Sequence, residues 1–155
     1  YDARANIMWA AIIAHNDLLS CGRGKDQTCH MIEKEINGLY DNIHGAGLTA
    51  ITPHWMRYIY KKRLNNFLQY AVKVWGVEMD FDDPERTALE GINRLESFYK
   101  KMGLPTNLTE LGIPNDRYED ISGRTTKLMG TGTVGRFVKL NKQDVLNILK
   151  MAENG

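Results

Sequence analysis

The chain has 155 residues, 43% of them hydrophobic and 25% charged, and carries a formal net charge of +1. These values fit one globular domain with a sizeable core, and they exclude a largely disordered chain. The charge is nearly balanced, and the basic residues are not clustered as a basic binding face would require. We therefore expect no nucleic-acid partner. The apolar run 7–14 is too short to span a bilayer, so no membrane partner is expected either.

The first two predicted helices follow from apolar residues that recur at helical spacing. One is expected over 3–19 and is broken by Cys21–Gly24. The next is expected over 27–39, with Asp26 as its cap. Its apolar stripe is formed by Met31, Ile32, Ile36 and Leu39. Residues 33–35 are therefore expected to face mostly outward.

Further helical patterns follow a short link over 40–43. A third helix is expected over 46–59, where Pro53 must kink or break it because proline lacks a backbone donor. Pro84 fits the first turn of a later helix over 84–102. The remaining expectations are helices over 64–75, 117–129 and 141–152, and a turn-rich connection over 106–115.

The sequence contains no convincing alternation of apolar and polar residues with period two, which is the pattern of a half-buried strand. The predicted fold class is therefore all-α, a helical bundle in one domain over 1–155. The chain opens at Tyr1 without an initiator Met, as expected of a fragment of a longer protein or of a processed product.

The two cysteines, Cys21 and Cys29, are too few to form a disulfide framework in a chain of this length. Their spacing is not that of a zinc knuckle. We expect both thiols to be reduced and the protein to be cytoplasmic.

His30 and His44 are the strongest candidates for chemistry. His30 falls in the first turn of one predicted helix and His44 at the junction into the next, so a helical hairpin could bring them together. Neutral imidazole is a good ligand for iron and zinc. Spacing alone leaves two readings open. Two histidines on buried helices are more often hydrogen-bonded core residues, and a catalytic metal usually holds at least three protein groups.

The residues around this pair resemble the iron-containing alcohol dehydrogenase family, especially its NAD(P)H-dependent butanol dehydrogenase branch. A histidine, thirteen intervening residues and then His44-Gly45 form a specific part of that resemblance. The resemblance covers nearly the whole chain, through Tyr1–Ala10, His15–Gly24, His30–Glu33, Gly38–Asp41, His44–Leu48, Pro53–Tyr58 and Gly135–Leu140.

The resemblance implies the C-terminal domain of a dehydroquinate synthase-like two-domain fold. In that family an N-terminal α/β domain binds the nicotinamide cofactor, NAD(H) or NADP(H), and the C-terminal helical domain carries the metal. Fe²⁺ is the metal implied, with Zn²⁺ or another divalent ion as alternatives. The dinucleotide-binding domain would be the partner of this chain within the same protein, and monomer and homodimer both stay open.

The metal site implied by the resemblance has four protein ligands. An Asp and a His one helical turn apart supply two of them, and these should lie upstream of Tyr1. The later histidine pair falls on His30 and His44. Asp26 and His30 have the same spacing of four as the family's Asp–His pair. The flanking residues nevertheless put Asp26 in the loop before the helix, where capping is a sufficient role.

Two further residues are implied at the site. Where the butanol dehydrogenase branch usually has another histidine, four residues after the first ligand of the later pair, this chain has Lys34. Lys34 shares a helical face with His30 and is the candidate for a catalytic proton or cofactor contact, although an exposed ammonium is the default for lysine. Gly45 is the candidate cofactor-binding residue, because a glycine beside a ligand lets the backbone turn tightly and leaves room.

Other motifs have simpler explanations. Gly130-Thr-Gly132-Thr-Val-Gly135 matches Gly-x-Gly-x-x-Gly but lacks the preceding strand and the following helix of a dinucleotide site, so a flexible loop that packs against the C-terminal helix is expected. His15 and His54 could line a substrate cleft, but the structural reading is preferred for both. Core anchoring is the simplest role for Trp9, Trp55 and Trp75.

The sequence therefore predicts a metal-dependent, NAD(P)-linked oxidoreductase that interconverts primary alcohols and aldehydes, represented here by its metal domain. The expected substrate is a small alcohol or aldehyde. The alternative is a non-catalytic helical binding module derived from such an enzyme. This chain alone is expected to be inactive.

Overall fold

The structure is a computed structural model, and it describes residues 1–22, 24–128 and 130–154. The helices within these residues are α1 (Asp2–His15), α2 (Thr28–Tyr40), α3 (His44–Ile59), α4 (Leu64–Trp75), α5 (Pro84–Lys101), α6 (Tyr118–Lys127) and α7 (Lys142–Met151). Short 3-10 turns lie at Leu18–Ser20, Tyr60–Arg63 and Asn115–Arg117. The only β pairing found there is an isolated bridge between Val134 and Leu140. The all-α prediction is confirmed.

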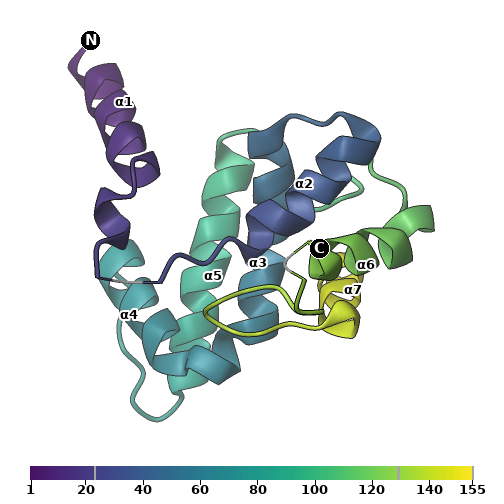
Figure 1. Ribbon diagram of the computed structural model, residues 1–155. Coiled ribbons are helices and arrows are strands. Elements are labelled where there is room, and N and C mark those ends of the chain that lie inside the picture. Colours follow the sequence, from purple (N-terminus) through teal and green to yellow (C-terminus); the bar gives the residue numbers. More distant parts are fainter. Residues whose placement is uncertain (23, 129, 155) are drawn as a thin grey trace.

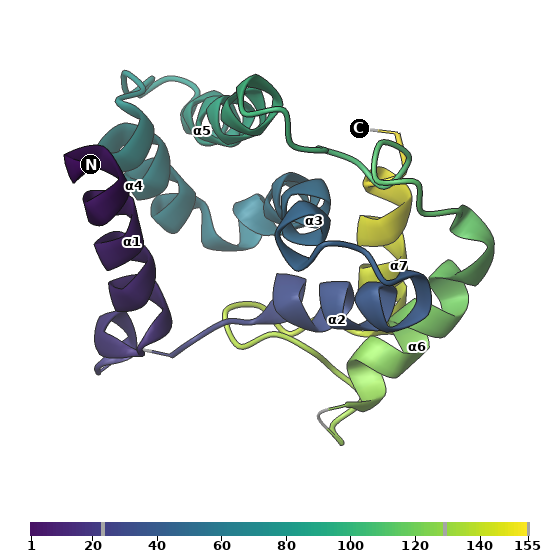
Figure 2. The same ribbon diagram turned by 90° about the horizontal axis from the view of Figure 1, so that it is seen from above.

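The helix α3 lies in the middle of the bundle, where it contacts α2, α5 and α7 (Figures 1 and 2). The helix α4 packs along α5, and α6 packs along α7 and also contacts α2. The apolar side chains between these helices form one core. Its fully buried members include Ile32, Ile36, Ile51, Ile59, Ile92, Leu108, Ile121, Leu140, Ile148 and Leu149.

Most predicted helix positions agree with the structure to within a few residues. The first is an exception, since α1 ends at His15 and a separate 3-10 turn follows at Leu18–Ser20. The predicted break over 21–24 and the predicted helix over 117–129 each include one position, 23 and 129, outside the described residues. Pro84 occupies the first turn of α5, as predicted, and the Asp83 carboxylate accepts from the backbone N–H of Arg86.

Pro53 was predicted to kink or break its helix, and the structure shows no break. The helix α3 runs without interruption from His44 to Ile59, with Pro53 buried in its interior. Proline inside a helix costs about 3 kcal/mol or more. Burial of apolar residues on both sides of it, including Ile51 and Ile59, offsets that cost because each fully buried side chain contributes roughly 1.5–3 kcal/mol.

The helix α1 lies at the edge of the molecule in both ribbon views and has no buried residue (Figures 1 and 2). Trp9 is 63% exposed, so its predicted role as a core anchor is wrong for this chain. Trp55 and Trp75 are partly buried and pack against the core as predicted. Residue type suggested a core position for Trp9, but the structure describes no element that covers its face of α1.

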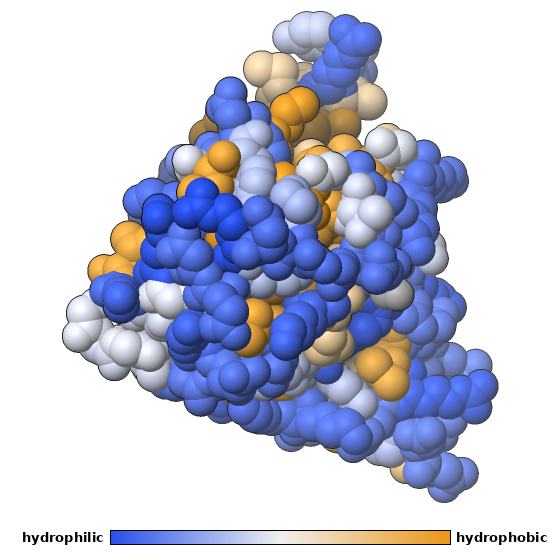
Figure 3. Space-filling model, turned by 90° about the vertical axis from the view of Figure 1, so that its right-hand side faces the viewer, coloured by the Kyte–Doolittle hydropathy of each residue, from blue (hydrophilic) through white to orange (hydrophobic). Residues whose placement is uncertain are grey.

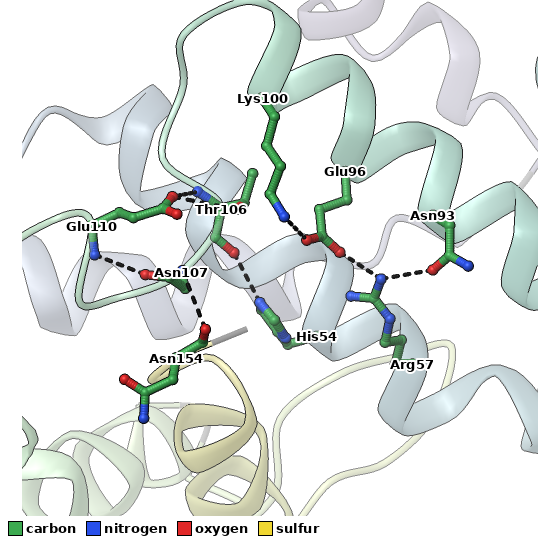
Figure 4. Close-up of polar contacts among 9 residues, drawn as sticks. All are labelled: His54, Arg57, Asn93, Glu96, Lys100, Thr106, Asn107, Glu110 and Asn154. Carbon is green, nitrogen blue, oxygen red and sulfur yellow. Dashed lines mark hydrogen bonds and ion pairs between the residues drawn. The ribbon is translucent and has the colours of Figure 1, made fainter.

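The side chain of His54 is structural, as the sequence suggested. It is buried in α3, and its Nε2 lies 2.9 Å from the carbonyl oxygen of Thr106, to which it donates (Figure 4). Burial lowers the pKa of His54. Beside it, Arg57 of α3 contacts Asn93 and Glu96 of α5 (Figure 4). This network joins α3 to α5 and to the loop before α6, and it leaves His54 no role in a cleft.

Asp26 lies one residue before the cap position of α2, which is Gln27. Its carboxylate accepts from the backbone N–H and the hydroxyl of Thr28, at 2.9 and 2.6 Å. The same carboxylate accepts from the backbone N–H groups of Arg136 and Phe137, at 2.7 and 2.6 Å. The predicted cap position is thus one residue off, and Asp26 instead fastens the loop before α7 to the start of α2.

Replacing Asp26 with alanine should lower the free energy of unfolding at pH 7 by about 1–3 kcal/mol, because partly buried N–H groups lose their acceptor. Burial would raise the pKa of Asp26, but the hydrogen bonds from Thr28, Phe137 and Arg136 outweigh burial, and the net pKa is lowered. The stabilisation is therefore complete above the ordinary pKa of an aspartate and is lost as the pH falls through the lower folded-state pKa. Urea unfolding at pH 7 and at pH values below 4 measures this. An equal difference between wild type and variant at all these pH values would contradict it.

The glycine-rich segment 130–135 follows α6 rather than a strand, and the structure contains no parallel sheet in the residues it describes. Gly135 has a φ of 91°, and a Cβ there would lie 2.7 Å from the Thr28 hydroxyl oxygen. The positive φ and the close approach of the backbone to Thr28 of α2 together explain why position 135 is a glycine. The segment is part of the loop into α7, and the dinucleotide reading is excluded for it.

The face that includes α6 and α7 is largely hydrophilic, with hydrophobic residues in small separate patches (Figure 3). In the part of the chain that the structure covers, none of the helices combines the length and apolar character needed to cross a bilayer. Cys21 and Cys29 are both free thiols.

Candidate metal centre

The link between α2 and α3 returns along α2 instead of leading away from it. Asp41 has a left-handed backbone, with a φ of 50°, and the Asn37 side-chain amide donates to the carbonyl oxygen of Asn42. Residues 33–40 of a helix span about 10 Å, and an extended link of three residues can cover about the same distance. The start of α3 therefore lies beside the middle of α2.

This return brings the two predicted histidines together. His30 lies in the first turn of α2, and His44 is the first residue of α3. Their ring centroids are 5.5 Å apart, and the ring planes are tilted by 53°. Both side chains are exposed on the same side of the helix pair. The hairpin geometry predicted from the sequence is confirmed, whereas metal ligation by the pair remains a prediction.

The two imidazoles have different surroundings. Burial of the His30 ring, with a smaller contribution from the neighbouring His44, lowers the pKa of His30. A lower pKa favours the neutral ring, which is the form that can bind a metal. The Nδ1 atom of His44 contacts the Oε2 atom of Glu33.

Glu33 is the main site residue that the sequence interpretation missed. It was expected to face outward, but its side chain is only 1% exposed. Its second oxygen, Oε1, accepts from the Asn42 side-chain amide at 3.1 Å. A signal was available in the sequence, since Glu33 follows His30 by three residues and so shares its helical face.

Gly47 is the glycine that this arrangement requires. A Cβ at Gly47 would lie 2.7 Å from the Glu33 Cγ and 2.6 Å from the Asn42 Nδ2. The reason predicted for Gly45 is wrong in part, since Gly45 has ordinary helical backbone in α3 and makes no tight turn. A Cβ at Gly45 would meet nothing within 4 Å, so open space beside His44 is confirmed.

An open cleft of about 380 Å³ lies over the histidine pair. Lys34 is exposed and lines it, on the same helix as His30. The other lining residues are Gln27, Met31, Glu33 and Asn37. Asp26 is not among the lining residues, and its carboxylate accepts from Thr28, Arg136 and Phe137 instead. His15 lies at the exposed end of α1, and His54 is buried elsewhere in α3.

The donor set fits one side of a metal site. Two imidazoles converge on one cleft, and the carboxylate of Glu33 holds the far nitrogen of one of them, as is usual for metal-binding histidines. Within residues 1–22, 24–128 and 130–154, no three His, Cys, Asp or Glu side chains are grouped so that they could hold a metal ion. A metal held by this histidine pair would need further ligands from outside the described residues.

The chain is a helical domain in which two histidines converge at the starts of consecutive helices, and this pair is its candidate metal site. Residues 1–153 match the model of the Fe-containing alcohol dehydrogenase family, C-terminal. The chain therefore belongs to the iron-containing alcohol dehydrogenase family, and the resemblance found in its sequence is confirmed.

Individual relatives agree with this assignment. The chain is 39% identical over 151 residues to NADH-dependent butanol dehydrogenase A of Clostridium acetobutylicum. It is 37% identical over 150 residues to the probable NADH-dependent butanol dehydrogenase 1 of Bacillus subtilis. In both cases the match covers 97% of this chain and 38% of the relative. The chain thus spans well under half of the length of these curated relatives.

A solved structure supports the fold over the same length. The NADH-dependent butanol dehydrogenase A of Thermotoga maritima superposes with a TM-score of 0.91 at 37% sequence identity. The superposition covers 99% of this chain and 40% of that one. The predicted helical bundle of a C-terminal domain is the fold that this comparison supports.

Proposed function

We propose that this chain is the metal-bearing helical part of an NAD(P)-linked oxidoreductase that interconverts primary alcohols and aldehydes. The observation that carries the proposal is the convergence of His30 and His44 in a chain of the iron-containing alcohol dehydrogenase family. Their ring centroids are 5.5 Å apart. The names of the relatives, which include butanol dehydrogenases and an aldehyde reductase, support the substrate class. Iron is the proposed metal, with zinc or another divalent ion as the alternative.

Three residues that line the cleft, and Gly45 beside it, have proposed roles. His30 and His44 hold the metal, which when bound supplies Lewis-acid polarisation of the alcohol or aldehyde oxygen. Lys34 lines the cleft four residues after His30 and is proposed to contact the cofactor or to carry a proton. Gly45 leaves the edge of the site beside His44 open, and we propose that the nicotinamide cofactor approaches there.

The upstream part of the polypeptide is proposed to supply the remaining ligands and the dinucleotide-binding domain. The exposed side of α1 supports a partner of this kind, since Ile7, Met8 and Trp9 are exposed by 70%, 66% and 63%. A helix of this length is marginal in water without packing partners, and contiguous exposed apolar side chains mark interaction surfaces. We propose that the upstream segment covers this surface of α1. The cytoplasm is the proposed compartment, in keeping with two free thiols.

Isothermal titration of Fe²⁺ and Zn²⁺ into the full-length protein tests the metal assignment. His30→Ala and His44→Ala should each weaken binding by more than about 100-fold, because loss of a ligand costs more than the 10–100-fold typical of a residue that only orients one. His15→Ala is the matched control and should bind like the wild type, since His15 lies at the end of α1 and away from the cleft. Unchanged affinity in both His30→Ala and His44→Ala would refute the proposed site.

A further inference from the structure

Glu33 is a buried carboxylate whose two oxygens are both directed at the start of α3. Its side chain is 1% exposed, its Oε2 contacts His44 Nδ1, and its Oε1 accepts from Asn42 Nδ2. Among the described residues, no lysine or arginine forms an ion pair with it. Burial of a carboxylate is costly unless it is paired and hydrogen-bonded, so a side chain of this kind needs a reason to be there.

The contact with Glu33 determines which nitrogen of His44 is available. An ionised carboxylate only accepts hydrogen bonds, so with Glu33 ionised Nδ1 of His44 carries the hydrogen that it donates to Glu33. In the neutral ring the lone pair is then on Nε2, the atom on the far side of the imidazole from Glu33. The His44 side chain is 58% exposed, whereas Glu33 is buried behind it. Nε2 is therefore the nitrogen that faces the cleft shared with His30.

The surroundings prevent Glu33 from moving away. The backbone of α3 at Gly47 lies so close that an added Cβ would be 2.9 Å from the Glu33 Oε1. Asn42 donates to the same oxygen, Oε1, and its backbone carbonyl accepts from the Asn37 side chain. The carboxylate is thus fixed by the packing of α2 against α3, before any metal is bound.

We propose that Glu33 is a positioning residue that selects the tautomer of His44 and fixes its ring plane, so that Nε2 is presented to the metal. The proposal rests on the proposed function for its consequence, because it assigns His44 as a ligand. Its structural part, the choice of tautomer by Glu33, stands on the contacts above alone.

The tautomer of His44 can be read by ¹⁵N NMR of the histidine rings in the metal-free, full-length protein. The wild type should show hydrogen on Nδ1 of His44. Glu33→Gln keeps the shape of the side chain. Because Asn42 Nδ2 donates to the remaining oxygen, the new amide NH₂ should face Nδ1 of His44 and shift the equilibrium toward hydrogen on Nε2. Glu35→Gln, the same change two residues along α2 at a partly exposed side chain, should leave the tautomer unaltered. An unaltered tautomer in Glu33→Gln would overturn the proposal.

Metal affinity provides the second readout, with Zn²⁺ as the probe and a competing chelator. Glu33→Gln should bind Zn²⁺ about 10–100-fold more weakly than wild type, the usual effect of removing such a partner, and Glu35→Gln should not. Gly47→Ala gives an independent variant, since its Cβ must displace the Glu33 side chain while both ionisable residues remain. It should also weaken binding, whereas Gly38→Ala in open space should not.

The outcomes separate the two proposals. Normal Zn²⁺ affinity in both Glu33→Gln and Gly47→Ala would overturn the positioning role. Failure of the wild-type protein to bind metal would overturn the proposed function instead. The NMR result would then still decide whether Glu33 selects the tautomer of His44. Thermal unfolding of each variant shows whether a loss of affinity is only a loss of fold.

Discussion

The 155 residues alone should oxidise no primary alcohol at a measurable rate when NAD or NADP and Fe²⁺ are supplied. The described residues hold two converging histidines but no third ligand grouped with them. The relatives are more than twice as long as the segment they share with this chain. Catalysis requires substrate, cofactor and metal to be held together. We therefore expect the isolated chain to lose the whole rate acceleration of the full-length enzyme, which is at least about a millionfold.

A spectrophotometric assay of NAD(P)H formation, run on the isolated chain and on the full-length protein, tests this prediction. Under the proposed function, the full-length protein should oxidise a small primary alcohol, and its His44→Ala variant should not. Turnover by the pure isolated chain that is lost in His44→Ala would contradict the need for upstream ligands. An inactive full-length protein that still binds metal would favour the alternative, a non-catalytic binding module. It would indicate that Lys34 does not replace the histidine that the butanol dehydrogenase branch usually has at this position.

Gly91→Leu should lower the free energy of unfolding by at least about 3 kcal/mol or prevent folding altogether. Gly91 is buried in α5, and a Cβ there would lie 2.5 Å from the Cβ and 2.7 Å from the Cα of Ala71 in α4. Ala71 is fully buried, and the clash is with backbone, which no rotamer change relieves. The two helices would have to separate along their contact.

Gly38→Leu is the matched control for Gly91→Leu. Gly38 also lies inside a helix, α2, but an added Cβ would meet nothing within 4 Å. Its replacement should change stability only by the difference in helix propensity, a gain of up to about 1 kcal/mol. Urea unfolding of both variants measures the contrast. Similar midpoints for the two would contradict close packing of α4 on α5.

The sequence by itself determined the fold class, the approximate helix positions and the two histidines. Helical periodicity and the signals at helix ends are local properties, and Pro84 shows how directly they act, since a proline in the first turn loses no hydrogen bond. The family resemblance, carried by residues from Tyr1 to Leu140, added the expected metal centre. Residue type and spacing made His30 and His44 candidates, and the family resemblance of the residues around them favoured the metal reading.

Only the tertiary structure decided which side chains face inward and which groups meet. Glu33 has the residue type of a solvated helix face, yet the return of the link after α2 buries it against His44 and Gly47. Trp9 has the residue type of a core anchor, yet no described element covers its side of α1. Pro53 remains inside a continuous helix because the core on both sides of it holds α3 together. Burial depends on which helices pack together, and that is set by contacts between residues far apart in the chain, which local periodicity does not encode.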